Sequence, residues 1–384
     1  MSLDHRSSLR VVLVTHFYPA HGGGVERVAA QLALCMAAEG AEVIWCASDT
    51  DAPPALPGVR CEPMESFNGV ERLTGFPYPL WSPRSLALLA SCVRSADAVH
   101  VHDCIYVGSL AAAWLARRHR KRLAVTQHIG LVPLGGVLRF ALGAANRLGA
   151  WIVLRHADGV GFISPAVRRY FEGLAGPSPR FHYVANGVDG TIFRPAQGQW
   201  GERRAVLGFD AKRPLLLFVG RFVAKKRLHL VRAMATLRPD WQWCIIGHGP
   251  DRPQAWGLPN VRVLPAMAQQ DLVPYYSAAD LLVLPSEGEG FPLVVQEAMA
   301  CGLPACITAE VASGAILPAE LWLELPERPG ETAERGVATI EGWLATPLPD
   351  RLAQRANCAH HAADTWHWDV AARVHLRWLR GERA

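Results

Sequence analysis

The sequence lacks the features that mark several common classes of protein. Its nine cysteines are scattered and form no C-x-x-C pair, so we expect reduced, buried thiols rather than a disulfide framework. The net charge is only +5, which suits small anionic ligands or an anionic membrane surface and is too weak to predict nucleic-acid binding. These absences favour a cytoplasmic protein that has no nucleic acid among its partners.

Long uninterrupted apolar runs are also missing. The run Val11–Val14 is too short for the apolar region of a signal peptide, so none is expected. The most apolar stretch, residues 131–154, contains Arg139 and Arg147, and a charge at the bilayer centre costs at least about 2.5 kcal/mol. We therefore predict a buried or surface-lying helix there. The basic run Arg117–Arg122 fits either a solvated helix end or a contact with anionic lipid headgroups.

What the sequence does have is a regular alternation of short apolar segments and helical stretches, which predicts an α/β fold with parallel sheets covered by helices. A chain of 384 residues is expected to form two domains. We predict an N-terminal domain at 1–193, a C-terminal domain at 194–365 that opens with a linker and a helix, and a final helix at 366–384 that packs back on the first domain. The strands are predicted at 9–17, 41–48, 95–103, 122–128, 156–164 and 180–189, then at 214–220, 241–247, 260–266, 280–286 and 303–309, and helices at 24–40, 109–120, 226–237 and 366–380.

Glycines come directly after the predicted strands at three places. The sequence HGGGVER, His21–Arg27, opens the first long helix, where Gly23 and Gly24 let an anion approach free backbone N–H groups. It does not match G-x-G-x-x-G, so a nicotinamide site is not expected, and an ordinary strand-to-helix turn is the structural alternative. The other two places are Gly220, which ends the apolar run LLLFVG before Arg221, and IIGHGP with Gly247 and Gly249.

Basic residues lie just beyond the strand that ends at Gly220. Arg221 could act as a two-pronged donor and Lys226 as a point charge on one diphosphate, and a solvated basic turn is the alternative. A fourth strand exit, SEGEGFPLVVQEA, holds Glu289 and Glu297 with seven residues between them. Glu297 could accept the vicinal hydroxyls of a ribose, and Glu289 those of a sugar.

Two patterns suggest metal sites but are interpreted otherwise. Asp49-Thr50-Asp51 reads D-x-D, yet it comes after a strand and precedes APPALP, so a polar loop is predicted. Cys358, His360, His361 and His367 match no standard zinc spacing, and an exposed helix is predicted there. No metal and no cofactor are expected.

Taken in order, these motifs resemble those of the retaining glycosyltransferases of family 4 (group 1 type), which have the GT-B fold. The matching segments are GGGVER, NGVD at Asn186–Asp189, the pair Arg221 and Lys226, and the E-x7-E of Glu289 and Glu297. The resemblance covers about residues 1–310. It implies two Rossmann-like βαβ domains that face each other across an interdomain cleft, with the acceptor on the first and the nucleotide-sugar donor on the second.

The resemblance also implies roles for individual residues. His128, Arg221, Lys226 and Glu289 would be catalytic, with His128 near the transferred sugar and the two cations on the departing diphosphate. Donor and nucleotide would be bound by Gly23, Gly24, Asn186, Gly220, Gly247, Gly249, Gly290, Phe291, Leu293 and Glu297. Residues selecting the base are expected within 265–272.

The implied activity is transfer of a sugar, with retention, from a nucleotide-diphosphate sugar to a saccharide or lipid-linked saccharide. This suits cell-surface polysaccharide or glycolipid synthesis by a cytoplasmic enzyme, peripheral on the inner face of the membrane. Two alternatives stay open: another GT-B enzyme acting on nucleotide sugars, such as an epimerase, and a non-catalytic protein that binds nucleotide sugars.

Overall fold

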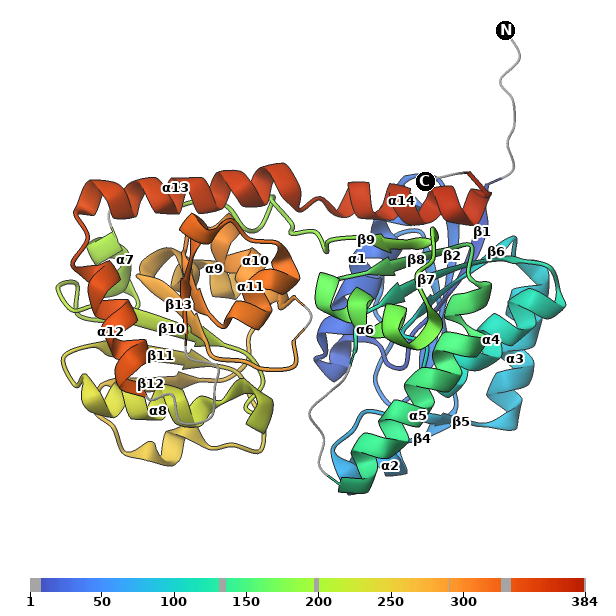
Figure 1. Cartoon of the computed structure of the whole chain (residues 1–384), viewed down its shortest axis with the longest axis horizontal. Coiled ribbons are helices and arrows are strands. Elements are labelled where there is room, and N and C mark those ends of the chain that lie inside the picture. The colour runs from blue at the N-terminus through green and yellow to red at the C-terminus, as the bar shows by residue number, and fades with distance from the viewer. Residues whose placement is uncertain (1–7, 131–135, 197–199, 290, 326–332, 383–384) are drawn as a thin grey trace, which may run out of the picture. The chain divides into compact units, whose positions relative to one another are not determined.

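The computed structural model describes residues 8–130, 136–196, 200–289, 291–325 and 333–382, and the chain divides into two compact units (Figure 1). The first unit comprises Met1–Asn186 and Trp368–Ala384, and the second comprises Gly187–His367. The chain therefore completes most of the first unit, builds the second, and returns to the first with its last helix.

The first unit is built on a parallel sheet whose strands have the order β3-β2-β1-β6-β7-β8-β9. Six of these strands were predicted, and β3 was missed because its sequence VRCEPM lies at the sheet edge and is only partly buried. The strands are β1 Arg10–Val14, β2 Glu42–Ser48, β3 Val59–Met64, β6 Ala98–His102, β7 Arg122–Gln127, β8 Gly159–Phe162 and β9 Phe181–Tyr183, and a small antiparallel pair joins β4 Ser66–Phe67 to β5 Leu80–Trp81.

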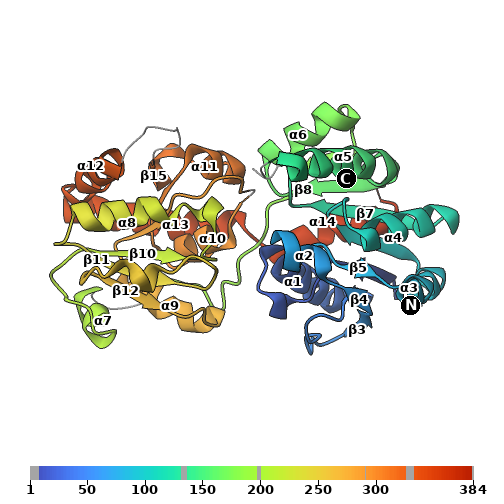
Figure 2. The same ribbon diagram turned by 90° about the horizontal axis from the view of Figure 1, so that it is seen from below.

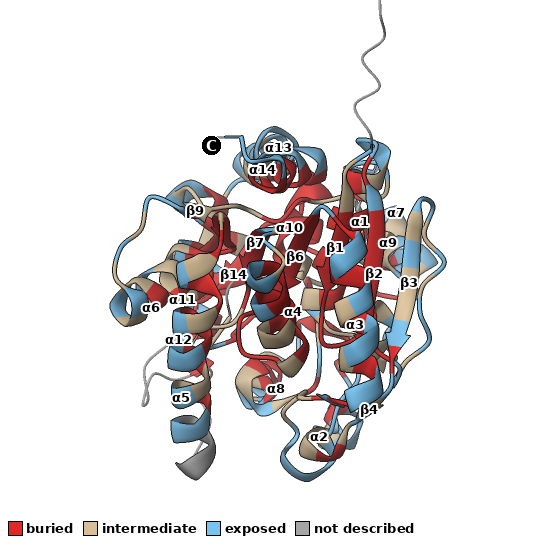
Figure 3. Ribbon diagram, turned by 90° about the vertical axis from the view of Figure 1, so that its right-hand side faces the viewer, coloured by how far each residue is buried: buried red, intermediate tan, exposed pale blue. Residues whose placement is uncertain are grey.

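Helices cover this sheet, so its central strands β1, β6 and β7 are buried over almost their whole length rather than on alternate residues. The residues Val11–Val14 of β1 are fully buried, and Figure 3 shows buried strands beneath helices with exposed outer faces. The helical segments are η1 Pro19–His21, α1 Gly24–Ala38, α2 Gly69–Thr74, α3 Pro83–Ser95, α4 Val107–Arg118, α5 Gly136–Ile152, η2 Leu154–His156, α6 Pro165–Ala175 and α14 Trp368–Arg380. Among the residues that the structure describes, no helix has the length and apolar character that crossing a bilayer requires.

The C-terminal helix α14 belongs to this first unit and packs on α1 and on strands β6, β7 and β8. Its Trp378 lies so close to Gly159 that a Cβ there would be 2.1 Å from the indole. Buried His375 shares a 2.8 Å hydrogen bond with Thr126, which also contacts His100 at 2.8 Å. A polar chain therefore fixes α14 on an otherwise apolar surface.

The second unit contains a parallel sheet in the order β12-β11-β10-β13-β14-β15. Its strands are β10 Leu215–Val219, β11 Gln242–Ile246, β12 Val261–Leu264, β13 Leu281–Leu284, β14 Ala305–Ile307 and β15 Trp322–Glu324. Its helical segments are α7 Trp200–Val206, η3 Ala224–Lys226, α8 Leu228–Leu237, η4 Pro253–Trp256, α9 Gln269–Ala278, α10 Leu293–Ala300, α11 Ala309–Ala315, η5 Ala319–Leu321, α12 Ala333–Leu344 and α13 Leu348–Thr365. The five predicted strands are confirmed, and the edge strand β15 was not predicted.

Two details of the second unit differ from the sequence-based expectation. The helix predicted from Lys226 begins only at Leu228, because Arg227 adopts a left-handed conformation with φ of 51° after a short 3₁₀ turn. The predicted exposed helix around Cys358 is α13, but Cys358 is fully buried and donates its thiol to the carbonyl of Leu321. His360 is exposed, so these two side chains do not converge.

A buried ion pair fastens α7 to the start of β13. Arg204 Nη2 lies 2.6 Å from Asp280 Oδ1, and the two side chains are 7% and 5% exposed. The other carboxylate oxygen of Asp280 accepts the backbone N–H of Leu215 at 2.8 Å. Burial makes each charge depend on the other, because an unpaired ion in the interior loses its hydration without compensation.

We expect Asp280→Asn to reduce the free energy of unfolding by about 3–5 kcal/mol, because it leaves the charge of Arg204 buried and unpaired. Urea denaturation measures the effect. The matched control is Glu42→Gln, which breaks a pair with Arg10 whose side chains are 45% and 40% exposed, and should change stability by less than about 1 kcal/mol. Equal effects of the two substitutions would contradict this account.

Candidate functional site

Each sheet has a point where the strand order reverses direction, and ligands of open α/β sheets bind beyond the carboxyl ends of the strands at that point. In the second unit the reversal lies between the neighbouring strands β10 and β13. The turn after β10 carries Arg221 and Lys226, and the loop after β13 carries Glu289. The predicted cationic and acidic residues of this unit therefore lie at one sheet edge.

The structure joins Lys226 and Glu289 directly. Lys226 Nζ lies 3.1 Å from Glu289 Oε1, and Lys225 Nζ lies 3.0 Å from the same oxygen. The side chains of Lys226 and Glu289 are 10% and 13% exposed, whereas that of Lys225 is 39% exposed. The backbone N–H of Glu287 also donates to the carbonyl of Lys225 at 2.9 Å, so the two loops are tied by backbone and side chain.

The protonation of this pair depends on its surroundings. Burial by itself would raise the pKa of Glu289, but the charges and hydrogen bonds of Lys226 and Lys225 lower it to about 2. The pKa of Lys226 is lowered, first by burial, with Lys225 and Arg221 adding repulsion, while Glu289 acts in the opposite direction. The carboxylate is thus ionised at any working pH, and the ammonium is a desolvated charge held by its partner.

The glycines of this edge serve close approach of the backbone. A Cβ on Gly247 would lie 1.9 Å from the carbonyl oxygen of Gly220, and one on Gly249 would lie 2.3 Å from that of Phe222. The turns after β10 and β11 therefore pack directly on each other, and Phe222 N–H donates to the carbonyl of His248 at 2.6 Å. The predicted site glycines Gly220, Gly247 and Gly249 shape the turn that presents Arg221, an exposed side chain.

Glu297 lies on α10 and is 2% exposed. Gln269 donates from Nε2 to its Oε1 at 2.9 Å, and the hydroxyl of Tyr276 donates to its Oε2 at 2.9 Å. Both partners come from α9. Sequence reasoning missed Tyr276 and noted Gln269 only as part of 265–272, since no local pattern reveals which distant side chain meets a carboxylate.

Three residues at the start of α10 were predicted to bind the donor, and the structure describes two of them. Gly290 lies outside the described residues. Phe291 is buried, with its ring edge-on to Trp366 at a centroid distance of 5.2 Å, so its side chain faces the core. Leu293 is the first residue of α10, and a first-turn N–H has no partner within its own helix.

In the first unit the strand order reverses between β1 and β6. The glycine loop after β1 runs through η1 into α1, with Gly22 in a left-handed conformation at φ of 86° and Gly23 as the N-cap. A Cβ on Gly23 would lie 2.0 Å from Glu26 Oε2, whereas one on Gly24 would meet nothing within 4 Å. Glu26 therefore lies over the loop, and the backbone at Gly24 is open to approach.

Glu26 is held in place by a histidine. His16 Nε2 lies 2.9 Å from Glu26 Oε1, and the side chains are 3% and 2% exposed. Burial opposes ionisation of Glu26, but the charge and hydrogen bond of His16 lower its pKa below the ordinary value. The ring of His16 stacks on Tyr106 at a centroid distance of 4.1 Å. Sequence reasoning missed this pair, although Glu26 lies inside the glycine motif.

His128 lies just after β7 and is buried beside a second histidine. Its Nε2 lies 2.9 Å from His102 Nδ1, and burial lowers the pKa of His128 to about 3, so the ring is neutral near pH 7. Asp103 Oδ1 accepts the backbone N–H groups of His128 at 2.7 Å and Ile129 at 3.0 Å. The predicted residue Asn186 is buried at the end of the first unit.

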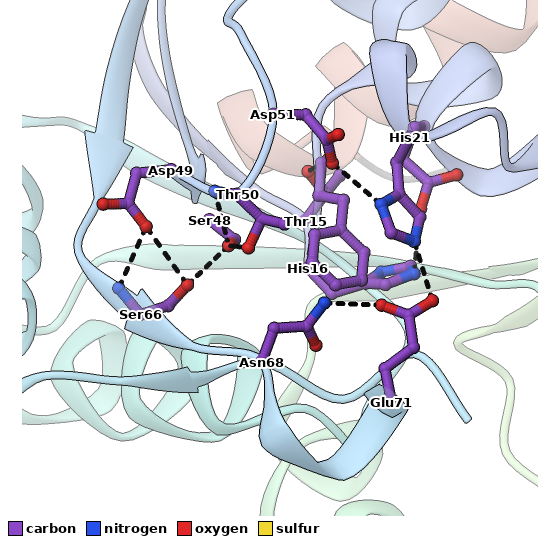
Figure 4. Close-up of polar contacts among 12 residues, drawn as sticks. Thr15, His16, His21, Ser48, Asp49, Thr50, Asp51, Ser66, Asn68 and Glu71 are labelled. Carbon is purple, nitrogen blue, oxygen red and sulfur yellow. Dashed lines mark hydrogen bonds and ion pairs between the residues drawn. The ribbon is translucent and has the colours of Figure 1, made fainter. Parts of the chain in front are cut away.

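The two carboxylates of the D-x-D sequence bind different partners (Figure 4). Asp49 accepts the backbone N–H of Ser66 at 3.0 Å, whereas Asp51 contacts His21 at 2.8 Å. They therefore serve as loop anchors, in agreement with the predicted polar loop. Across the described part of the chain, no group of three or more His, Cys, Asp and Glu side chains is arranged to hold a metal ion.

Comparison with known proteins agrees with this arrangement. Residues 22–191 match the family profile "Glycosyltransferase Family 4", and residues 213–333 match "Glycosyl transferases group 1". The D-inositol 3-phosphate glycosyltransferase of Mycobacterium sp. (strain JLS) is 30% identical over 322 residues, which cover 75% of this chain and 70% of that protein. A GDP-mannose-dependent alpha-mannosyltransferase of Mycolicibacterium smegmatis is 28% identical, covering 77% of this chain and 78% of the relative.

Solved structures show the same fold over nearly the whole chain. Sucrose-phosphate synthase from Thermosynechococcus elongatus superimposes with a TM-score of 0.78 at 20% identity, covering 97% of this chain and 98% of that protein. The Anabaena protein HepE, crystallised with UDP-glucose, superimposes with a TM-score of 0.76 at 17% identity, covering 97% and 100%. At these identities the likeness establishes the GT-B architecture.

Buried Asp103, beside His128, gives the stability of the protein a measurable dependence on pH. Burial raises its pKa to about 6 from an ordinary value of 3.8, against the opposing N–H bonds of Ile129 and His128. The native carboxyl binds its proton more tightly than the unfolded chain does, so the contribution of Asp103 to the free energy of unfolding falls as the pH rises from about 4 to about 6 and is then constant. Asp103→Asn keeps an acceptor oxygen but has no proton to lose.

We therefore expect the stability of Asp103→Asn relative to the wild type to rise between pH 4 and pH 6 and to level off above it. Urea denaturation of both proteins at several pH values measures the difference. Parallel curves over this range would contradict the raised pKa of Asp103.

Proposed function

The chain belongs to glycosyltransferase family 4, the group 1 glycosyltransferases with the GT-B fold, and we propose that it moves a sugar, with retention of configuration, from a nucleotide-diphosphate sugar to a saccharide or lipid-linked saccharide. The observation that carries the proposal is the buried contact between Lys226 and Glu289 at the strand-order reversal of the second unit. It supplies a desolvated cation where a phosphate group would bind and a carboxylate beside it for a sugar hydroxyl.

The charge balance of this edge suits a diphosphate. Arg221, Lys225 and Lys226 bring three cations, and Glu289 removes one of these charges. Breaking the glycosidic bond develops negative charge on the departing diphosphate, and preorganised charges in a dry site stabilise it at little reorganisation cost. Because these side chains can take the role of a metal ion, we propose that the reaction is metal-independent.

Glu297 suits the ribose of the donor. Its carboxylate is oriented by Gln269 and Tyr276, and a carboxylate can accept from both hydroxyls of a vicinal diol. The relatives support the donor class: HepE was crystallised with UDP-glucose, and a related mannosyltransferase is named for GDP-mannose. In the same proposal the diphosphate is removed from the sugar and assists in taking the acceptor proton, and the product contributes to cell-surface saccharide.

An enzyme that uses a lipid-linked acceptor must bind the membrane, and α5 of the first unit has a surface suited to that binding. Phe140, Leu148 and Trp151 are 80%, 49% and 62% exposed and recur at helical spacing along its outer face, with Arg147 among them. The neighbouring helix α4 (Figure 2) exposes Trp114. Such an apolar stripe with basic residues is typical of helices that lie in the membrane interface.

The basic run Arg117–Arg122, for which a lipid contact was one of two predicted roles, lies next to this helix. Arg117 at the end of α4 contacts His156 at 2.7 Å, just after the end of α5. Part of the run is used within the protein, because Arg122 pairs with Asp158 at 2.6 Å and Lys121 donates to the carbonyl of Ala96. Arg117, Arg118 and Arg120 are exposed, so we propose peripheral binding to anionic membranes through this face of the first unit.

Lys226→Ala tests the proposed chemistry. If Lys226 acts on the charge that develops on the leaving diphosphate, its loss should reduce kcat at saturating donor by about a hundredfold or more. Single-turnover and steady-state transfer from a panel of nucleotide-diphosphate sugars measure the effect, after circular dichroism confirms folding. Lys212→Ala, in the exposed turn before β10, is the matched control and should leave kcat unchanged.

An increase in donor KM with unchanged kcat would make Lys226 a binding residue and contradict this role. The same assay, run with EDTA and then with added Mn²⁺, tests metal independence, which predicts equal rates. A protein that binds nucleoside diphosphate yet shows neither transfer nor donor hydrolysis would contradict the enzymatic proposal as a whole.

The membrane proposal predicts that Phe140→Ser/Trp151→Ser weakens binding to vesicles of anionic lipid by roughly tenfold or more, because two large exposed apolar side chains no longer enter the interface. Vesicle co-sedimentation at two salt concentrations measures it. Val206→Ser removes a side chain that is 87% exposed on the second unit and should have no effect. If vesicle binding does not change with lipid charge, with salt or with the two substitutions, the proposed membrane contact through α5 is wrong.

A further inference from the structure

His21, in the glycine loop of the first unit, lies between two carboxylates (Figure 4). Its Nδ1 is 2.8 Å from Asp51 Oδ2 and its Nε2 is 3.0 Å from Glu71 Oε1. The imidazole stacks on Phe17 at a centroid distance of 3.8 Å with the planes 12° apart. Asn68 Nδ2 donates to the other oxygen of Glu71 at 2.5 Å, so ring and acid are both fixed in orientation.

The two contacts define the protonation state that this geometry needs. A neutral imidazole carries one N–H and one bare nitrogen, while an ionised carboxylate only accepts hydrogen bonds. Both ring nitrogens can therefore donate only in the imidazolium form, and loss of one proton leaves a lone pair facing a carboxylate oxygen. Histidine is the side chain whose charge ordinarily changes near neutral pH.

His21, Asp51 and Glu71, here called the His21 clamp, join three segments that are distant in the chain. His21 ends η1 and is followed by Gly22 and by Gly23, the N-cap of α1. Asp51 lies after β2, and Glu71 lies on α2. Both acids come from segments outside the glycine loop, and both contact the loop through the same imidazole ring.

We propose that His21 is a positioning residue whose imidazolium ties the glycine loop to Asp51 and Glu71, so that binding of an anionic donor by the loop amides depends on the proton that His21 carries. The proposal rests on the proposed function and on the sequence-based expectation that Gly23 and Gly24 bind the donor. It also assigns the second aspartate of the D-x-D sequence to this clamp.

The surrounding charges set the direction of the pH effect. His21 is faced by Asp51 from the segment after β2 and by Glu71 from α2. Nearby Glu26 on α1 is paired with His16, and the charge of His21 is among the causes that lower the pKa of Glu26. Loss of the His21 proton leaves three acids near the loop with one fewer cation, which disfavours an incoming anion. Donor affinity should therefore fall as His21 is deprotonated.

The test combines a readout that needs no substrate with one that does. In ¹⁵N-histidine-labelled full-length protein, both ring nitrogens of His21 should show protonated shifts at low pH. Hydrogen exchange of residues 19–24 should become faster as the ring titrates. His21→Arg should keep the loop protected at high pH, because a guanidinium offers two donors that stay charged. Asp49→Asn, in the same segment as Asp51 but bound to Ser66, is the control and should leave the loop unchanged.

In the transfer assay, His21→Gln should raise the donor KM roughly tenfold at pH 6.5, the loss of one charge-assisted hydrogen bond, and leave kcat within about twofold. His21→Arg should restore KM and remove its dependence on pH. A singly protonated His21 at all pH values, or a donor KM that neither substitution nor pH changes, would overturn the proposal. Absence of transfer by the wild-type protein would instead count against the proposed function, while the nitrogen shifts and loop exchange would still test the clamp.

Discussion

The contact between Lys226 and Glu289 is the constraint on which the second unit's candidate site depends. A buried pair of charges is weak evidence for stability, because the cost of removing both ions from water can exceed their attraction. The fold nevertheless places the two residues in the segments that follow the neighbouring strands β10 and β13, and it joins these segments through Lys225 and Glu287. The pair keeps an ammonium charged and dry before any ligand arrives. A ligand phosphate would then meet a cation that has already lost its water, which is the condition under which electrostatic stabilisation is strongest.

The two units share an architecture but arrange opposite charges at the equivalent edge. The second unit gathers Arg221, Lys225 and Lys226 around one carboxylate. The first unit gathers acids held by histidines, with Glu26 bound to His16 and both Asp51 and Glu71 bound to His21. In the proposed clamp, both contacts of His21 require its imidazolium form, because an ionised carboxylate only accepts hydrogen bonds. Under that proposal, anion binding by the first unit's glycine loop depends on protonation in a way that anion binding at the lysine-based edge does not.

Sequence reasoning found the frame of both units and the residues at strand ends, because apolar runs mark buried parallel strands and the residues just beyond those runs lie at one sheet edge. It missed β3, whose Pro63 and Glu62 break the apolar pattern, and it began α8 too early because nothing local reveals the left-handed turn at Arg227. It also missed the contacts Tyr276–Glu297, His16–Glu26 and His21–Asp51. Each joins residues from separate elements, and their meeting depends on packing that no periodicity records.

The protonation of His128 limits the part that this residue can take in the proposed chemistry. Burial keeps the ring of His128 neutral. It also lowers the pKa of the neighbouring His102 well below the ordinary value, so that ring is neutral as well. One of these two rings supplies the proton of their shared 2.9 Å hydrogen bond, and Asp103 fixes the backbone at His128. A neutral, fixed imidazole can orient a hydroxyl but cannot neutralise a departing diphosphate. Under the proposed function, His128 therefore contributes a directional hydrogen bond and no charge.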